Sequence, residues 1–186
     1  MELINSEIII ETERLSLEPL HLKHAIALFS FLQEESIYQY IPQNPPASLK
    51  VLEQRYQKLA TRLSPDKNEA WLNWAVYHKQ LQIYIGQLEA TVLPNRSSQI
   101  AYLFSPLFWR QGYAHEACQH LIFDLCQNYN LIEITAEVDT RNLASIRLLQ
   151  KLGFVIVETI ENANFFGGNV SNEYIFRLDF KRNSVF

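Results

Sequence analysis

The sequence predicts an α/β (α+β) fold, in which a central mixed, mostly antiparallel sheet is flanked by helices. Short β-branched and aromatic runs fill residues 71–104, and an amphipathic helical pattern follows at residues 114–125. A strand, a helix and a second strand then follow one another between residues 132 and 160. This mixture is typical of helices packed on one sheet. At roughly 150 residues per domain, the 186 residues are expected to form a single domain, 1–186.

The N-terminal part is expected to hold one strand and two helices. Residues 14–18 alternate apolar and polar side chains, as a half-buried strand does. Leu22, Ile26 and Phe29 then share one helical face, and residues 48–63 repeat apolar side chains at helical spacing between two proline-containing loops. The chain therefore begins strand, helix, helix.

The middle of the chain is expected to form an antiparallel meander followed by a long helix. Residues 71–77, 83–92 and 99–104 predict three strands that are separated by short polar turns. From Ala114 to Leu125 the apolar residues follow the helical template most closely in the whole sequence.

The C-terminal part is expected to complete the sheet. Residues 132–138 predict a strand, residues 142–152 a helix that ends at Gly153, and residues 154–160 a further strand. Residues 174–180 alternate again and are expected to close the sheet.

The composition excludes several classes of protein. With 48% apolar and 19% charged residues the chain has ample material for a core, and a net charge of -4 disfavours a sequence-independent grip on nucleic acid or anionic lipid. The opening segment MELINSEIII lacks a basic secretory signal, and no apolar stretch approaches the roughly 20 residues of a membrane helix. We therefore expect a cytoplasmic protein without nucleic-acid or membrane partners.

The two cysteines, Cys118 and Cys126, both fall in the predicted long helix. Their separation along that helix is about 12 Å at 1.5 Å per residue, whereas a disulfide requires Cα atoms within roughly 7 Å. They are expected to be unpaired thiols, and no metal site is expected.

The run from Trp109 to Ala117 has the features of an anion site. Gly112 allows a close backbone approach, Ala114 is too small to obstruct it, and the free N–H groups at a helix start attract negative charge. Arg110 adds a charged donor suited to phosphate oxygens. A simple turn before a helix is the alternative interpretation, and the pattern matches neither a P-loop nor a Rossmann fingerprint.

A second group of residues lies thirty positions further on. Asn142 is placed to cap a helix, Ser145 falls one turn later on roughly the same face, and Gly153 ends the helix. Helix capping alone would account for Asn142 and Ser145.

Together these segments resemble the GNAT superfamily of acetyl-CoA-dependent N-acetyltransferases. The resemblance rests on the strand, the Arg-Gln-Gly-Tyr-Ala turn, the long helix, the strand Ile-Thr-Ala-Glu-Val-Asp, and then Asn-Leu-Ala-Ser and Lys-Leu-Gly-Phe. The early Thr-Glu-Arg-Leu at residues 12–15 and the Asn-x-x-Ser spacing are similar to the group that includes the ribosomal-protein acetyltransferases RimJ and RimL. The resemblance extends from about residue 8 to residue 180 and implies acetyl-CoA as the cofactor.

The resemblance also implies cofactor-binding positions. The loop and helix start that hold the CoA pyrophosphate correspond to Arg110, Gln111, Gly112, Tyr113 and Ala114. The strand along the pantetheine arm, with the contact to the thioester carbonyl, corresponds to Leu103, Phe104 and Ser105. Asn142 and Ser145 match positions near the cofactor's sulfur and pantetheine.

The sequence departs from the family pattern at two positions. Trp109 stands where a polar phosphate contact is common, so that Arg110 is expected to substitute for it. Leu149 stands where many relatives carry a tyrosine general acid, and it cannot donate a proton. Ser145 is the nearest hydroxyl that the motif suggests for the leaving sulfur.

Acetylation of an amine also requires removal of a proton, because the substrate is mostly an ammonium at neutral pH. The candidate bases are Glu137, near the end of a predicted strand, and Glu89, on the strand before the cofactor strand; either could instead be a solvated residue or a salt-bridge partner. A backbone N–H near Phe104 is expected to stabilise the oxyanion. Asp139 is expected to support the turn before Asn142.

We therefore expect an N-acetyltransferase that transfers acetyl from acetyl-CoA to a primary amine by direct attack on the thioester. The acceptor is either a protein N-terminal α-amine or a small-molecule amine, and a homodimer is possible. Two alternatives stay open: a non-catalytic acyl-CoA-binding regulatory module, and an α/β domain whose motifs are coincidental. His115 and His120 are expected at the surface. Aromatic side chains that could line an acceptor pocket are Trp71, Trp74, Phe165 and Phe166, although core packing is the preferred role of the tryptophans.

Overall fold

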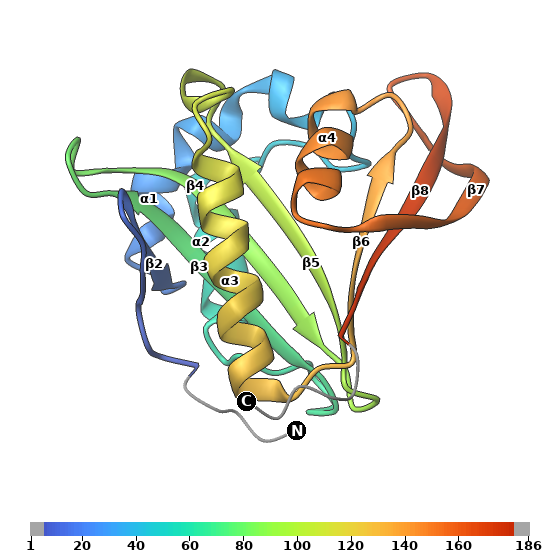
Figure 1. Cartoon of the computed structure of the whole chain (residues 1–186). Coiled ribbons are helices and arrows are strands. Elements are labelled where there is room, and N and C mark those ends of the chain that lie inside the picture. The colour runs from blue at the N-terminus through green and yellow to red at the C-terminus, as the bar shows by residue number, and fades with distance from the viewer. Residues whose placement is uncertain (1–5, 181–186) are drawn as a thin grey trace.

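The computed structural model describes residues 6–180, which form one mixed sheet with helices on both sides (Figure 1). The eight strands lie in the order β1-β2-β3-β4-β5-β6-β8-β7, and neighbouring strands are antiparallel except for the parallel pair β5 and β6. The predicted mixed, mostly antiparallel sheet is therefore confirmed. The ends of the expected domain, residues 1–5 and 181–186, lie outside the described part of the chain.

The elements follow the predicted order closely. The strands are β1 (Ile10–Glu11), β2 (Leu15–Pro19), β3 (Ala70–His78), β4 (Ile83–Val92), β5 (Ser97–Phe104), β6 (Glu133–Asp139), β7 (Val155–Phe166) and β8 (Asn169–Asp179). The α-helices are α1 (His24–Phe29), α2 (Leu49–Leu59), α3 (Tyr113–Tyr129) and α4 (Leu143–Lys151). Short 3-10 turns are η1 (Phe31–Gln33), η2 (Glu35–Tyr38) and η3 (Pro106–Phe108).

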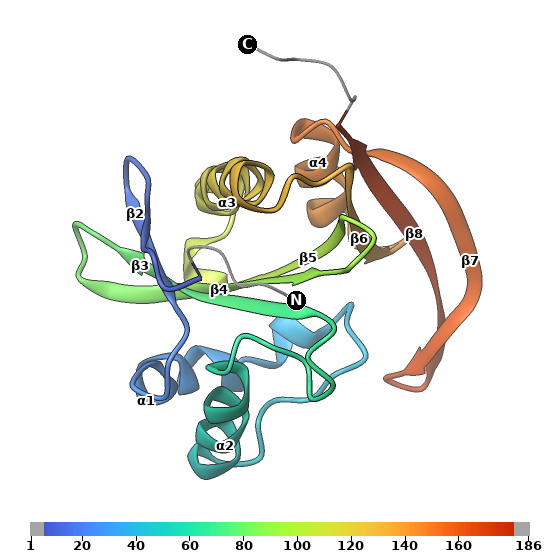
Figure 2. The same cartoon turned by 90° about the horizontal axis from the view of Figure 1, so that it is seen from below.

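The helices form two layers, with α3 and α4 on one side of the sheet and α1 and α2 on the other (Figure 2). The larger core lies under α3, where Ala117, Leu121 and Leu125 pack on the apolar side chains of the sheet. The smaller core lies under α1 and α2 and includes Leu28 and Leu52. Both faces of the sheet are therefore buried around its centre, as expected for a layered α/β domain.

The strands β5 and β6 diverge after a short parallel contact. Their pairing runs from Ser97 with Glu133 to Gln99 with Thr135 and then stops. Figure 1 shows the two strands together near the bottom of the view and apart at the top, where α4 begins. The backbone of both strands is therefore unpaired on this side over their last residues.

The N-terminal helices differ from the sequence prediction. The expected apolar face of α1 was wrong at two positions, because Leu22 and Ile26 are 49% and 71% exposed, whereas Ala25 and Leu28 are buried against α2 and β3. The helix begins only at His24 and is short, so its buried face is set by packing rather than by the longer repeat. The second helix also ends earlier than predicted, at Leu59 rather than at residue 63.

The C-terminal hairpin is longer than predicted. The strand expected at residues 154–160 continues to Phe166, and its partner begins at Asn169 instead of Tyr174. Gly167 and Gly168, with φ of +58° and +77°, make the two-residue turn between them. A Gly-Gly pair between two strands is a standard hairpin signal, so this turn was readable in the sequence. The two-residue strand β1 was not predicted.

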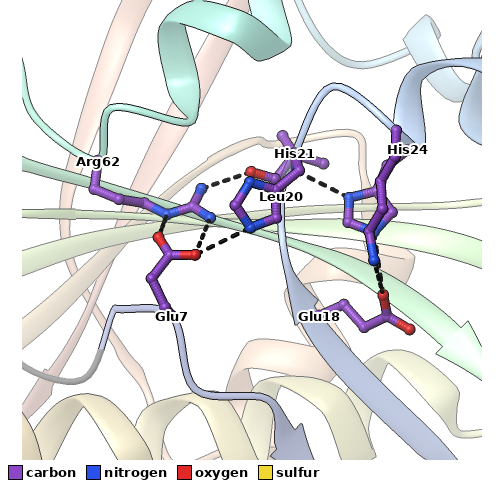
Figure 3. Close-up of polar contacts among 7 residues, drawn as sticks. Glu7, Glu18, Leu20, His21, His24 and Arg62 are labelled. Carbon is purple, nitrogen blue, oxygen red and sulfur yellow. Dashed lines mark hydrogen bonds and ion pairs between the residues drawn. The ribbon is translucent and has the colours of Figure 1, made fainter.

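Polar contacts around the buried Arg62 side chain join the N-terminal segment to the α1 and α2 layer (Figure 3). The Arg62 side chain is almost fully buried; its Nε donates to Glu7 Oε1 at 2.9 Å and its Nη1 donates to the Leu20 carbonyl at 2.8 Å. His21 Nε2 lies 3.0 Å from the other Glu7 oxygen. Arg62 thus joins the segment before β1, the end of β2 and the loop after α2.

His24 extends this arrangement at the start of α1 (Figure 3). Its Nδ1 accepts from the His21 backbone N–H at 2.9 Å, so Nε2 carries the ring proton and faces Glu18 Oε2 at 3.2 Å. Burial lowers the pKa of His24, and the hydrogen bond to Glu18 opposes this shift only in part. The folded protein therefore holds His24 as a neutral donor.

Cys118 and Cys126 are both unpaired, as predicted, and both lie on α3. Within residues 6–180, no helix is long and apolar enough to cross a membrane.

Candidate functional site

The turn between β5 and α3 has the backbone of an anion site. Gly112 is the N-cap of α3 with φ of +84°, and no side chain caps the helix start. Arg110 also has a positive φ, +60°, which is uncommon for a residue with a side chain. The first N–H groups of α3 are therefore available to a ligand and lie at the positive end of a 17-residue helix.

Arg14, the residue before β2, contacts this turn and the first turn of α3. Its Nε lies 2.6 Å from Glu116 Oε2, and its Nη1 donates to the Gln111 carbonyl at 3.0 Å. Thr12 Oγ1 donates to Glu116 Oε1 at 2.6 Å, and the guanidinium lies 4.3 Å from the centre of the Tyr113 ring. In the sequence, Thr12 and Arg14 are notable only for their resemblance to the family motif. The structure shows that both side chains contact Glu116 of α3, which lies about a hundred residues further along the chain.

At the end of β5, the backbone groups of successive residues point alternately toward β4 and toward the divergence from β6. The Ser105 N–H donates to the Ile85 carbonyl at 2.9 Å, which fixes the alternation of the β4 and β5 ladder. By this alternation the backbone of Leu103 points toward β4, whereas that of Tyr102 points toward the divergence from β6. The Phe104 carbonyl accepts the indole N–H of Trp109 at 2.7 Å. Tyr102, which the sequence analysis did not select, thus offers the free backbone groups expected of Leu103.

The start of α4 faces the same region. Asn142 Oδ1 accepts from the Ser145 backbone N–H at 3.2 Å, so Asn142 is the predicted N-cap. Leu149 is fully buried in the core under α3 and α4. The hydroxyl of Tyr102 is covered as well, and it has no regular hydrogen-bond partner within the described residues.

Glu89 lies on the opposite face of the sheet, because its neighbours Leu88 and Ala90 point into the core under α3. The Glu89 carboxylate accepts from Gln87 Nε2 at 2.7 Å and lies 3.4 Å from Arg55 Nη2. Glu89 is therefore a salt-bridge partner in the free protein, which is one of the alternatives to a catalytic base that the sequence left open.

A second carboxylate group lies on that same face, at the end of β6. Glu137 is exposed, Asp139 is opposite Glu173 of β8 in the antiparallel pair, and the three side chains share one face. Burial and the negative charge of Glu137 raise the pKa of Glu173, and the hydrogen bond from Asn164 opposes this shift. Glu173 could not be predicted from the sequence as a site residue, because nothing local to residues 169–179 places it beside Glu137.

Asp139 has the structural role that was predicted for it. Its carboxylate accepts from the Arg141 backbone N–H at 2.8 Å and from Arg141 Nη2 at 2.6 Å. The Asn142 backbone N–H donates to the Asp139 carbonyl at 2.9 Å. Asp139 thus shapes the turn that leads from β6 into α4.

A cavity of about 260 Å³ opens on the face that carries Glu89. Its walls come from the loop at residues 43–47, from Val51 and Arg55 of α2, and from Gln87 and Leu103 of the sheet. The cavity therefore touches β5 from the side opposite to α3.

None of the aromatic side chains considered for an acceptor pocket lines this cavity, and the Phe166 ring lies 5.8 Å from the Arg141 guanidinium, at the turn after β6. Trp74 is buried in the core, as preferred, and the Trp71 indole N–H donates to Glu69 at 2.8 Å. Phe165 is 72% exposed on the hairpin. His115 and His120 are half-buried on α3, and the described residues contain no cluster of three or more metal-ligating side chains.

Comparisons with known proteins agree with this arrangement. A family model described as an acetyltransferase (GNAT) domain matches residues 14–155. YoaA of Bacillus subtilis, named as an uncharacterized N-acetyltransferase, is 27% identical over 148 residues, which cover 78% of this chain and 82% of YoaA.

Solved structures share the fold. RimL, a ribosomal L7/L12 α-N-protein acetyltransferase solved in complex with coenzyme A, superposes with a TM-score of 0.82 at 16% identity, covering 92% of this chain and 98% of RimL. An acetyltransferase of the GNAT family from Bacillus anthracis superposes with a TM-score of 0.78 at 20% identity, covering 92% and 98% of the two chains. Because the family model spans most of the sequence, the protein belongs to the GNAT acetyltransferase family and is an acetyl-CoA-dependent N-acetyltransferase.

Proposed function

We propose that this protein acetylates a primary amine that reaches the thioester of acetyl-CoA through the divergence of β5 and β6. The observation that carries the proposal is that the groups suited to the cofactor and the carboxylates suited to the amine lie on opposite faces of the sheet. The helix start at Gly112 and the Ser145 side chain lie on the α3 and α4 side, whereas Glu137 and Glu173 lie on the α1 and α2 side. The divergence joins the two sides where the β5 and β6 backbones are unpaired.

The residues of the α3 and α4 side fit coenzyme A. The uncapped N–H groups of residues 112–114 would bind the pyrophosphate, with Arg110 as a charged donor. The free backbone groups of Tyr102 and the N–H of Phe104 would bind the amide-containing arm, and Asn142 and Ser145 would lie toward the sulfur end. When bound, acetyl-CoA supplies an acetyl group that its thioester makes reactive toward an amine.

Carboxylates on the other side would prepare the amine. An ammonium must lose a proton before its nitrogen can attack, and a base with a raised pKa performs this best near neutral pH. Glu173 meets that requirement because burial and the nearby charge of Glu137 raise its pKa. Glu137 stays a candidate for the same role, whereas Glu89 is better suited to fixing Arg55 beside the cavity.

The cavity next to Leu103 would receive the part of the acceptor that lies behind the amine. A volume of about 260 Å³ accommodates either a small-molecule amine or the first residues of a peptide. The likeness to RimL, an α-N-protein acetyltransferase, supports the protein N-terminal α-amine.

The experiment is a screen for thiol release from acetyl-CoA with a panel of amines. One arm contains peptides with different N-terminal residues, and the other contains small amines and polyamines. Release that depends on an amine, with the acetylated product seen by mass spectrometry, is the expected result. Binding of acetyl-CoA without release in either arm would favour the non-catalytic module, and absence of both would refute the cofactor site.

A further inference from the structure

The Tyr102 hydroxyl is an unsatisfied polar group in a covered position. Its oxygen has no measurable exposure and no regular hydrogen-bond partner among residues 6–180, although part of the ring is exposed. Leaving a buried hydroxyl unpaired is unfavourable, because the group loses its hydrogen bonds to water. A phenylalanine would fill the same space without this cost, so the hydroxyl calls for a hydrogen bond that forms only in a working state of the protein.

The surroundings of the hydroxyl indicate where that partner lies. Tyr102 shares its face of β5 with Ile100 and Phe104, both buried in the core under α3. Burial, followed by the nearby Cys118 side chain, raises the pKa of Tyr102 well above its ordinary value, and the nearby Ser145 side chain opposes this shift. Ser145 is therefore close, but the pair lacks the geometry of a full hydrogen bond in the free protein.

The Ser145 backbone is held in place, but its side-chain hydroxyl is not. Asn142 fixes its backbone N–H at 3.2 Å, whereas its hydroxyl can still rotate. A second hydroxyl that donates to Ser145 Oγ would leave the Ser145 proton pointing away from Tyr102. Leu149, further along α4, is buried and has no hydroxyl, so it supplies no such donor.

We propose that Tyr102 is a positioning residue for Ser145: with acetyl-CoA bound, the Tyr102 hydroxyl donates to Ser145 Oγ and turns the Ser145 O–H toward the departing sulfur. This inference rests on the proposed function. The two hydroxyls act as a relay of hydrogen bonds in which the phenol orients the serine and the serine stabilises the charge that develops on sulfur.

The relay needs no proton of its own. In the reaction a C–N bond forms and the C–S bond breaks. The ammonium loses one proton on the carboxylate side before the attack and a second one after it. The sulfur leaves as a thiolate that takes one proton from water, so one proton is released overall. Ser145 and Tyr102 both keep their protons throughout. The high pKa of Tyr102 agrees with this role, because the phenol stays a donor at every pH at which the amine reacts.

The first test compares Tyr102→Phe, Ser145→Ala and the double variant in steady-state kinetics. We expect Tyr102→Phe to lower kcat about fivefold to twentyfold with less than about a threefold change in KM for acetyl-CoA, and the double variant to be no slower than Ser145→Ala. Tyr77→Phe, on β3 and outside the site, is the matched control and keeps the parental kcat. Full kcat in Tyr102→Phe, or losses that multiply in the double variant, would overturn the proposal.

The second test does not use turnover. The thiol of bound coenzyme A is titrated by its thiolate absorbance, and a hydroxyl aimed at the sulfur lowers its pKa below that of free coenzyme A. We expect Tyr102→Phe and Ser145→Ala to raise this pKa by similar amounts, and Tyr77→Phe to leave it unchanged. An unchanged pKa in Tyr102→Phe would contradict the relay even if no amine substrate had been found.

The third test separates a functional hydroxyl from a structural one. Without coenzyme A, Tyr102→Phe should have a Tm equal to or above that of the parent, because it removes an unsatisfied group. A clearly lower Tm would mean that the hydroxyl stabilises the free fold, against the proposal. Failure of the parent protein to bind coenzyme A would refute the proposed function and this inference together, whereas binding with unaltered thiol pKa values refutes only the inference.

Discussion

Arg14 Nε lies 2.6 Å from Glu116 Oε2, and this pair joins the residue before β2 to the first turn of α3. The Glu116 side chain is 13% exposed and also accepts from the Arg14 backbone N–H at 2.8 Å. The contact ties the turn that contains Gly112 to the sheet, so it fixes the direction of the first N–H groups of α3.

Glu116→Gln is therefore expected to weaken both the fold and cofactor binding. The amide cannot accept the same charged hydrogen bonds, and the loss should be roughly 1–2 kcal/mol in urea denaturation at neutral pH. Titration with coenzyme A should show a lower affinity than the parent. Glu161→Gln, on the exposed strand β7, is the control and should change neither quantity.

Arg110→Ala tests the charged donor at the same turn. Because Arg110 is exposed, its contact with phosphate is screened by salt. We expect coenzyme A to bind about threefold to tenfold more weakly at low ionic strength, with the difference shrinking at high salt. Lys58→Ala removes the same charge on α2, across the sheet, and serves as the control. An equal effect of both variants would show that only the net charge matters.

His24 predicts a pH dependence of stability near neutrality. Burial lowers its pKa from the ordinary 6.5, with partial opposition from Glu18, so the unfolded chain binds a proton that the folded protein does not. Stability contributed by the neutral form is complete above pH 6.5 and is lost as the pH falls below it. Urea denaturation should show a flatter pH dependence in His24→Gln than in the parent or in His120→Gln. Identical slopes in all three proteins would contradict the assignment.

Substitution by the matching amide distinguishes the roles of the carboxylates of β6 and β8. Loss of a general base typically costs a hundredfold or more in rate, so Glu173→Gln should lower kcat by about a hundredfold and flatten the acidic limb of its pH profile. Glu137→Gln should have a smaller effect, through the pKa of Glu173, and Glu133→Gln serves as the control. If Glu137→Gln is the slower enzyme, Glu137 is the base instead.

The parts of the site that could be predicted from the sequence are those formed by local contacts. Gly112 precedes a long helix, and Asn142 lies three residues before Ser145, so each of them affects only the helix turn that follows it. The structure has the start of α3 and the cap of α4 at these two positions. Gly167 and Gly168, with positive φ, form the hairpin turn through an equally local preference.

The remaining parts depend on which strands become neighbours. Glu173 meets Glu137 only because β8 lies between β6 and β7, and the free backbone of Tyr102 follows from the point at which β5 and β6 stop pairing. Neither the position of β8 in the sheet nor the point at which β5 and β6 stop pairing produces a periodic pattern in the sequence. The exposed Ile26 shows the same limit in a helix, where tertiary packing overrode a plausible repeat.

The most direct test of the account is stabilisation by coenzyme A in the parent and in Gly112→Asp. Aspartate would place bulk and negative charge where the pyrophosphate approaches the backbone, and the strain of φ +84° is matched in Gly168→Asp, at φ +77° on the hairpin. At about 100 times its Kd, coenzyme A should stabilise the parent and Gly168→Asp by roughly 2.7 kcal/mol, and it should not stabilise a folded Gly112→Asp. Equal stabilisation of Gly112→Asp, or none of the parent at millimolar coenzyme A, would contradict the account.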